Sequence, residues 1–69
     1  MDPLIQELER LRQSEGLSVG RFSLRLGLSR PYYYLVKTGQ RAFSRRALGK
    51  ILKAYPQLMP RVMDYVMRE

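Results

Sequence analysis

A long stretch of the chain is rich in basic side chains and contains no acidic ones. Between Gly16 and Lys53 there are nine lysines and arginines and not one aspartate or glutamate. Both side chains bind phosphate oxygens, and a guanidinium can also donate two hydrogen bonds to the O6 and N7 atoms of guanine. The nine residues are Arg21, Arg25, Arg30, Lys37, Arg41, Arg45, Arg46, Lys50 and Lys53. The chemistry that they offer is the binding of a polyanion.

The charge of the whole chain supports this interpretation. Its 69 residues include 13 Lys or Arg and 6 Asp or Glu, for a net charge of +7, and all the acids lie near the two ends. A solvated surface normally mixes both signs, because like charges repel. The pattern indicates a nucleic acid or an acidic membrane surface as partner, with a generic basic surface as the alternative.

Catalytic and metal-binding residues are scarce. The chain has no cysteine and no histidine, which rules out disulfides, the commonest zinc ligands and the usual nucleophile–base pairs. Ser18, Ser29 and Ser44 are each explained as helix caps. We therefore expect no enzyme activity and no catalytic residue, and no cofactor, metal or small-molecule ligand.

The length and hydropathy indicate one domain, spanning residues 1–69, since domains mostly run from about 50 to 250 residues. The longest uncharged stretch, Ala54 to Pro60, has seven residues, whereas a membrane span needs about 20. No basic start followed by an apolar run marks a secretory signal. We expect no membrane partner and a cytoplasmic, nucleoid-associated protein.

Start and stop signals predict an all-α fold of five helices. The first runs from about Pro3 to Ser14 behind an Asp2 cap, and Gly16 follows it. The second is capped by Ser18 and ended by Gly27, and the third is capped by Ser29 and runs to Lys37. The fourth begins after Ser44 and is interrupted at Pro56, and the fifth runs from about Pro60 to Met67. No segment alternates for long enough to form a strand.

The spacing of apolar residues predicts which face of each helix is buried. In the first helix Glu7, Glu9, Arg10 and Arg12 lie off that face. In the third, Tyr33 and Val36 face the core, while Arg30, Tyr34 and Lys37 point outward. The other expected core positions are Leu4, Ile5, Leu8, Leu11, Val19, Phe22, Leu26, Ala47, Leu48, Ile51, Leu52 and Tyr55.

Two short helices joined by a tight glycine turn, residues 18–37, have the shape of a helix-turn-helix. From Leu11 to about Leu58 the chain resembles the helix-turn-helix domain of phage repressors, Cro and the xenobiotic-response-element regulators. The family often has Glu where Lys37 stands, so the charge is reversed here. The matching features are Leu17-Ser18, Phe22, Ser23, the turn Leu26-Gly27-Leu28-Ser29, Tyr33, Val36, Gly39-Gln40-Arg41, Leu48, Ile51 and Leu52.

The resemblance implies a λ-repressor-like domain that binds double-stranded DNA in a sequence-specific way, with the helix from Arg30 to Lys37 in the major groove. Such a protein regulates transcription, and we expect a repressor that occupies an operator. Side chains at the N-terminal end of that helix reach base edges. The expected base-reading residues are Ser29, Arg30, Pro31, Tyr34 and Leu35. For Arg30 a phosphate contact or a solvated charge remains open, and Leu35 either touches a thymine methyl group or packs internally.

The loop after the third helix and the start of the fourth are expected, from the resemblance, to lie against the sugar-phosphate backbone. The exposed backbone N–H groups behind a Ser44 cap also favour an anion. The expected phosphate-binding residues are Ser18, Arg21, Tyr32, Lys37, Thr38, Gln40, Arg41, Arg45 and Arg46.

The last helix has more apolar residues than one core-facing stripe requires. We therefore expect a homodimer whose interface includes Leu58, Met59, Val62, Met63, Val66 and Met67. The alternative functions are a protein-interaction module on the same fold, such as an antitoxin or an anti-repressor, a membrane-surface binder, and an RNA-binding domain that stacks tyrosines on unpaired bases.

Overall fold

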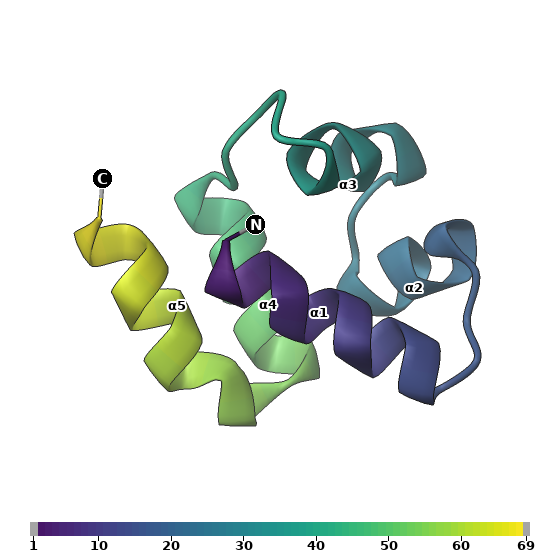
Figure 1. Cartoon of the computed structure of the whole chain (residues 1–69), viewed down its shortest axis with the longest axis horizontal. Coiled ribbons are helices and arrows are strands. Elements are labelled where there is room, and N and C mark those ends of the chain that lie inside the picture. Colours follow the sequence, from purple (N-terminus) through teal and green to yellow (C-terminus); the bar gives the residue numbers. More distant parts are fainter. Residues whose placement is uncertain (1, 69) are drawn as a thin grey trace.

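The computed structural model describes residues 2–68, and within that range the chain is all-helical, with five α-helices and one 3₁₀ turn (Figure 1). The all-α, five-helix prediction is confirmed. The helices are α1 (Pro3–Ser14), α2 (Val19–Leu26), α3 (Arg30–Lys37), α4 (Arg45–Ala54) and α5 (Met59–Met67), and the turn η1 (Pro56–Leu58) joins the last two.

The N-terminal boundaries of α1 to α4 are set by the predicted caps. The Asp2 carboxylate accepts a hydrogen bond from the N–H of Leu4 at 2.8 Å. The three serine hydroxyls accept from the N–H three residues further on, at 3.2 Å for Ser18, 3.2 Å for Ser29 and 3.1 Å for Ser44. Each cap satisfies a donor that has no partner inside the helix, which is why these short polar residues precede the helices.

The helices pack around one apolar core. In Figure 1, α1 crosses in front of α4, with α5 on one side and the α2–α3 pair on the other. The core contains Phe22, Tyr33 and Phe43, all nearly inaccessible to solvent. The ring of Phe22 meets Tyr33 edge-on, with centroids 5.7 Å apart. Phe43, in the loop before α4, packs on Tyr65 of α5 with centroids 5.9 Å apart.

Two tyrosine hydroxyls anchor the loop between α3 and α4. The hydroxyl of Tyr65 accepts a hydrogen bond from the N–H of Phe43 at 2.9 Å. The hydroxyl of Tyr32 accepts one from the N–H of Ser44, also at 2.9 Å. Because both bonds go to the backbone just ahead of α4, the loop is fixed to α3 on one side and to α5 on the other.

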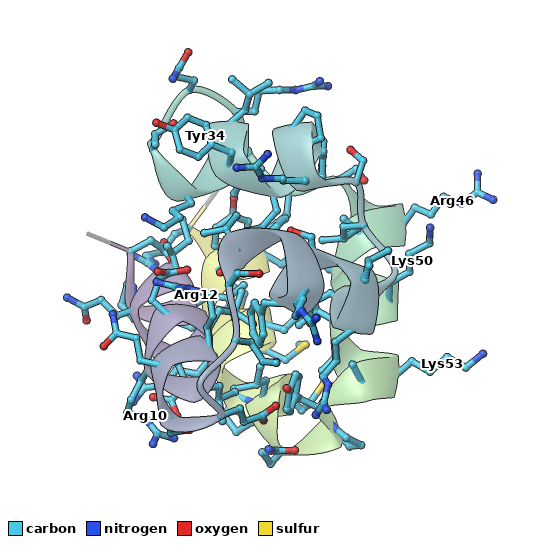
Figure 2. All side chains as sticks on the ribbon, turned by 90° about the vertical axis from the view of Figure 1, so that its right-hand side faces the viewer. Arg10, Arg12, Tyr34, Arg46, Lys50 and Lys53 are labelled. Atoms are coloured by element: carbon cyan, nitrogen blue, oxygen red, sulfur yellow. The ribbon has the colours of Figure 1, made fainter. Side chains whose placement is uncertain are left out.

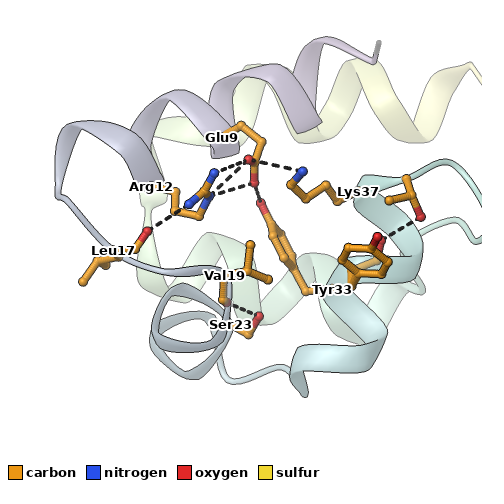
Figure 3. Close-up of polar contacts among 9 residues, drawn as sticks. Glu9, Arg12, Leu17, Val19, Ser23, Tyr33 and Lys37 are labelled. Atoms are coloured by element: carbon orange, nitrogen blue, oxygen red, sulfur yellow. Dashed lines mark hydrogen bonds and ion pairs between the residues drawn. The ribbon is translucent and has the colours of Figure 1, made fainter.

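The position of Glu9 differs from the sequence-based prediction, which placed it off the apolar face of α1. The side chain is buried, and its carboxylate accepts a hydrogen bond from the hydroxyl of Tyr33 at 2.8 Å and one from Arg12 at 2.8 Å (Figure 3). The ammonium of Lys37 lies 3.7 Å from the same carboxylate. Arg12 also donates to the carbonyl of Leu17 at 3.0 Å. We call Glu9, Arg12, Tyr33 and Lys37 the buried ion cluster.

The buried ion cluster connects α1 to two points on α3, Tyr33 in the middle of the helix and Lys37 at its C-terminal end. Burial raises the pKa of Glu9, but the hydrogen bonds from Arg12 and Tyr33 outweigh it and hold the pKa below its ordinary value of 4.5. Burial, and then the bond to Glu9, raise the pKa of Tyr33. Glu9 is therefore a carboxylate at neutral pH and Tyr33 a neutral donor. The positive charge of Lys37 is matched by an acid on α1.

Candidate nucleic-acid interface

Helices α2 and α3 pack against each other across a short turn. Gly27 takes a left-handed φ of +76° at the end of α2, and the N–H of Leu28 bonds back to the carbonyl of Ser23 at 2.9 Å. Ser23 is completely buried, as its small size allows. The turn thus leaves α3 with Tyr33 and Val36 in the core and its opposite face toward solvent.

The exposed face of α3 carries four of the five expected base-reading residues. Ser29, Arg30, Pro31 and Tyr34 are all exposed, and Leu35 is half-buried. Figure 2 shows Tyr34 on this outer face of α3. The hydroxyl of Ser29 accepts the capping bond from Tyr32 and keeps its own proton available to donate.

Arg30 lies against the start of α2. A Cβ atom added at Gly20 would be 3.5 Å from Cδ of Arg30, so the stem of the side chain rests on that glycine. Within residues 2–68 no hydrogen bond or ion pair engages its guanidinium. A groove runs here between the N-terminal ends of α2 and α3, lined by Ser18, Val19, Gly20, Arg21, Leu24, Leu28, Ser29 and Arg30.

Leu24 also lines this groove, although the sequence analysis did not identify it as a candidate site residue. Its side chain is 78% exposed, which is unusual for a leucine in a short helix. The signal was present in the sequence, because the core positions Val19, Phe22 and Leu26 leave Leu24 on the outer face of α2.

The loop from Thr38 to Arg41 is held by its own polar groups. The amide of Gln40 donates to the hydroxyl of Thr38 at 3.0 Å, and that hydroxyl donates to the carbonyl of Tyr34 at 2.9 Å. The guanidinium of Arg41 lies over the ring of Tyr32, 5.3 Å from its centroid. Of these predicted phosphate ligands, Arg41 is an exposed residue whose guanidinium rests on an aromatic face, whereas the side chains of Thr38 and Gln40 are bonded to each other.

Two expected phosphate ligands are placed differently by the structure. Tyr32 is half-buried and its hydroxyl is bonded to the backbone of Ser44, so it supports the loop. Lys37 was expected to point outward, and this was wrong, because its ammonium lies beside Glu9 in the buried ion cluster. Sequence spacing did not reveal these roles, since both partners are distant in the chain.

One face of α4 extends the basic surface. Arg46, Lys50 and Lys53 follow one another at helical spacing and project from the same side of α4 (Figure 2). Lys50 donates to the carbonyl of Gly27 at 3.0 Å and so also supports the end of α2. Arg45 and Arg46 are exposed in the first turn of α4. There they oppose the helix dipole, a local cost that a bound phosphate would offset.

The acidic side chains of residues 2–68 are paired with cations other than those around the outer face of α3. The ion pairs of the described residues are Glu7–Arg10, Glu9–Arg12, Glu9–Lys37, Glu15–Arg25, Asp2–Arg68 and Asp64–Arg68. The cations that surround the outer face of α3 are absent from that list: Arg21, Arg30, Arg41, Arg45 and Arg46. Their field is therefore left to attract an external anion.

The expected dimer surface divides into a buried and an exposed part. Leu58 and Val62 are only 2% and 4% exposed and pack in the core of their own domain, so their assignment to a dimer interface was wrong. Four residues remain on the outer side of α5: Met59, Met63, Val66 and Met67. Their spacing of four, three and one places them on one helical face, which we call the α5 apolar face.

Comparison with known proteins agrees with this geometry. Residues 4–57 match the model of the helix-turn-helix domain family, and the chain belongs to that family. No curated protein and no solved structure gives a significant match. Family membership indicates DNA binding in the regulation of transcription, and helix-turn-helix domains are typically not enzymes. Between residues 2 and 68 no helix has the length and apolar character that crossing a membrane requires.

Proposed function

We propose that this protein is a sequence-specific regulator that represses transcription by occupying an operator, with α3 in the major groove of double-stranded DNA. The observation that carries the proposal is the outer face of α3, where exposed polar and aromatic side chains are surrounded by cations without acidic partners. A helix fits the major groove, in which each base pair shows a distinct pattern of donors and acceptors. The start of α2, the loop after α3 and the start of α4 then lie against phosphates.

The alternative of RNA binding is less well supported. It requires exposed aromatic rings for unpaired bases. Of the three consecutive tyrosines, Tyr33 is buried in the core and Tyr32 is covered by Arg41, which leaves Tyr34. One exposed ring on a short helix does not make a platform on which several unpaired bases could stack. It is compatible with a helix that enters the major groove of DNA.

Selection from a random duplex pool, followed by titration of the best duplex at several salt concentrations, tests the proposal. We expect one enriched sequence. If about five cations per subunit neutralise phosphates, log K should fall against log salt with a slope of about −4 to −5 per subunit. A pool without enrichment would refute sequence-specific binding, and a slope shallower than about −2 would remove the electrostatic part of the argument.

We also propose that the active species is a homodimer formed through the α5 apolar face. Met59, Met63, Val66 and Met67 make a surface that a second copy can cover, and methionine tolerates imperfect packing. A symmetric pair that reads two half-sites on one side of DNA requires its two α3 helices to lie about 34 Å apart, the spacing of successive turns of DNA. The domain measures 29 × 25 × 21 Å, so two copies side by side can meet that spacing.

Met63→Lys should convert the dimer to a monomer, because it buries an unpaired charge at the centre of the α5 apolar face. Sedimentation velocity measures the change, and circular dichroism checks that the helices remain. Leu24→Lys is the matched control, since it makes the same change at an exposed apolar residue of α2 and should leave the dimer intact. A wild-type monomer at high concentration and on its operator would exclude the interface.

A further inference from the structure

A small hollow on α3 is lined by Arg30, Pro31 and Tyr34 alone. These residues occupy positions i, i+1 and i+4, so Arg30 and Tyr34 stand one above the other on one face, with Pro31 beside them. The pyrrolidine and phenol rings give two apolar walls, and Tyr34 is 52% exposed. The hollow opens on the side of α3 opposite the buried Tyr33 and Val36.

The chemistry of this hollow suits one feature of base-pair edges. In the major groove the bases present hydrogen-bond donors and acceptors, and the apolar exception is the C5-methyl group of thymine. A polar base edge placed against Pro31 and Tyr34 would give up bonds to water without replacement, which is unfavourable. A methyl group placed there is removed from water without losing any hydrogen bond, which is favourable.

Arg30 determines what lies next to that methyl group. Its stem rests on Gly20 of α2, so the side chain forms a wall between the hollow and the groove at the start of α2. Its guanidinium has no partner among residues 2–68 and is free to donate to the O6 and N7 of guanine, the commonest specific contact in this groove. Because Arg30 itself borders the hollow, a guanine that its guanidinium contacts would lie in a base pair next to the one that carries the methyl group.

We infer that the hollow of Arg30, Pro31 and Tyr34 is a subsite for the methyl group of a thymine adjacent to the guanine that Arg30 contacts. This inference rests on the proposed function, since it requires α3 in the major groove. It specifies that the enriched operator contains thymine beside guanine in each half-site. It also assigns a different base to each side chain: Arg30 recognises the guanine, and the rings of Pro31 and Tyr34 recognise the methyl group.

Substitution of deoxyuridine for each thymine of the selected duplex, one at a time, tests the inference. The exchange removes the methyl group and preserves base pairing. Binding should weaken by about threefold to fivefold at one thymine per half-site, the effect of burying one methyl group, and at a position next to the guanine. No measurable effect at any thymine would overturn the inference and leave the selected sequence, and so the proposed function, in place.

Three variants identify the residues that sense the methyl group. Tyr34→Ala should bind the thymine and deoxyuridine duplexes equally, because one wall of the hollow is gone. Leu35→Ala, a neighbouring apolar truncation outside the hollow, should keep the difference. Arg45→Ala should weaken both duplexes by the same factor. If Leu35→Ala abolishes the difference and Tyr34→Ala retains it, the methyl group lies on Leu35 and the inference is wrong.

Discussion

Replacing Glu9 with alanine is expected to destabilise the domain by about 2 to 4 kcal/mol, because it leaves Arg12, Lys37 and the hydroxyl of Tyr33 without their acceptor. A domain of this size has only about 3 to 5 kcal/mol in total, so much of the variant should be unfolded at 37 °C. Denaturant titration followed by circular dichroism measures the change.

The matched control is Glu7→Ala, on the same helix. Glu7 pairs with Arg10 on the surface, and such pairs contribute about 0 to 1 kcal/mol. A loss below 1 kcal/mol is therefore expected for Glu7→Ala. Equal losses in the free energy of unfolding for Glu9→Ala and Glu7→Ala would contradict this prediction. They would show that the buried ion cluster stabilises the domain no more than a surface ion pair does.

The same cluster predicts how stability changes with pH. Because the pKa of Glu9 is lowered by folding, its contribution is present above its ordinary pKa of 4.5 and is lost as the pH falls through the lower value of the folded state. The pKa of Tyr33 is raised, so its contribution is complete below its ordinary value of 10.0 and is lost as the pH rises beyond it. Glu9→Gln should flatten the acid limb of the stability curve.

Replacing Arg30 with alanine is expected to cost about 1 to 3 kcal/mol of binding to the selected operator and to relax the preference at one base pair. Its guanidinium is exposed near the N-terminal end of α3 and has no partner among the described residues, so it is available to a base edge. Contacts to bases specify a sequence, whereas contacts to phosphates position the protein. Binding to unrelated DNA should therefore change little.

Arg45→Ala and Arg46→Ala are the comparison variants, because both arginines lie in the first turn of α4, where the backbone is within easier reach than a base. Each should weaken all sequences alike and reduce the salt slope by about one unit. Titration of cognate and scrambled duplexes at two salt concentrations measures both effects. Equal losses on both duplexes for Arg30→Ala would make Arg30 a phosphate ligand and assign specificity to Ser29, Tyr34, Leu35 or DNA shape.

The predictions for Glu9→Ala and Arg30→Ala are linked, because Glu9 contacts one face of α3 and Arg30 lies on the other. Tyr33 points from α3 to Glu9 on α1, while Arg30 and Tyr34 project from the opposite face of the same helix. A change in the buried ion cluster that rotates α3 would therefore also move the side chains that we expect to read bases. A Tyr33→Phe variant separates the effects, since it removes one hydrogen bond and keeps the ring that packs on Phe22.

The sequence alone determined where α1 to α4 begin and, apart from Glu9 and Lys37, which side of each of these helices faces inward. Asp2, Ser18, Ser29 and Ser44 could be identified as caps because capping is a bond between residues two or three positions apart, and spacing in the chain reveals it. Helical periodicity likewise predicted that Tyr33 and Val36 are buried. The exposed basic surface around α3 followed from the absence of acids between Gly16 and Lys53.

Only the tertiary structure decided the partners of the polar groups. Glu9 and Tyr33 are 24 positions apart and Phe43 and Tyr65 are 22 apart, and no local pattern encodes such pairs. Lys37 could not be assigned to Glu9 from the sequence, since a lysine at the edge of an apolar stripe faces either solvent or a neighbouring helix. Leu58 and Val62 were assigned to a second subunit because composition counts apolar residues without showing which neighbour covers them. The packing of η1 against α4, and of α5 against α1 and α4, covers these two residues within the domain and leaves Met59, Met63 and Met67 exposed.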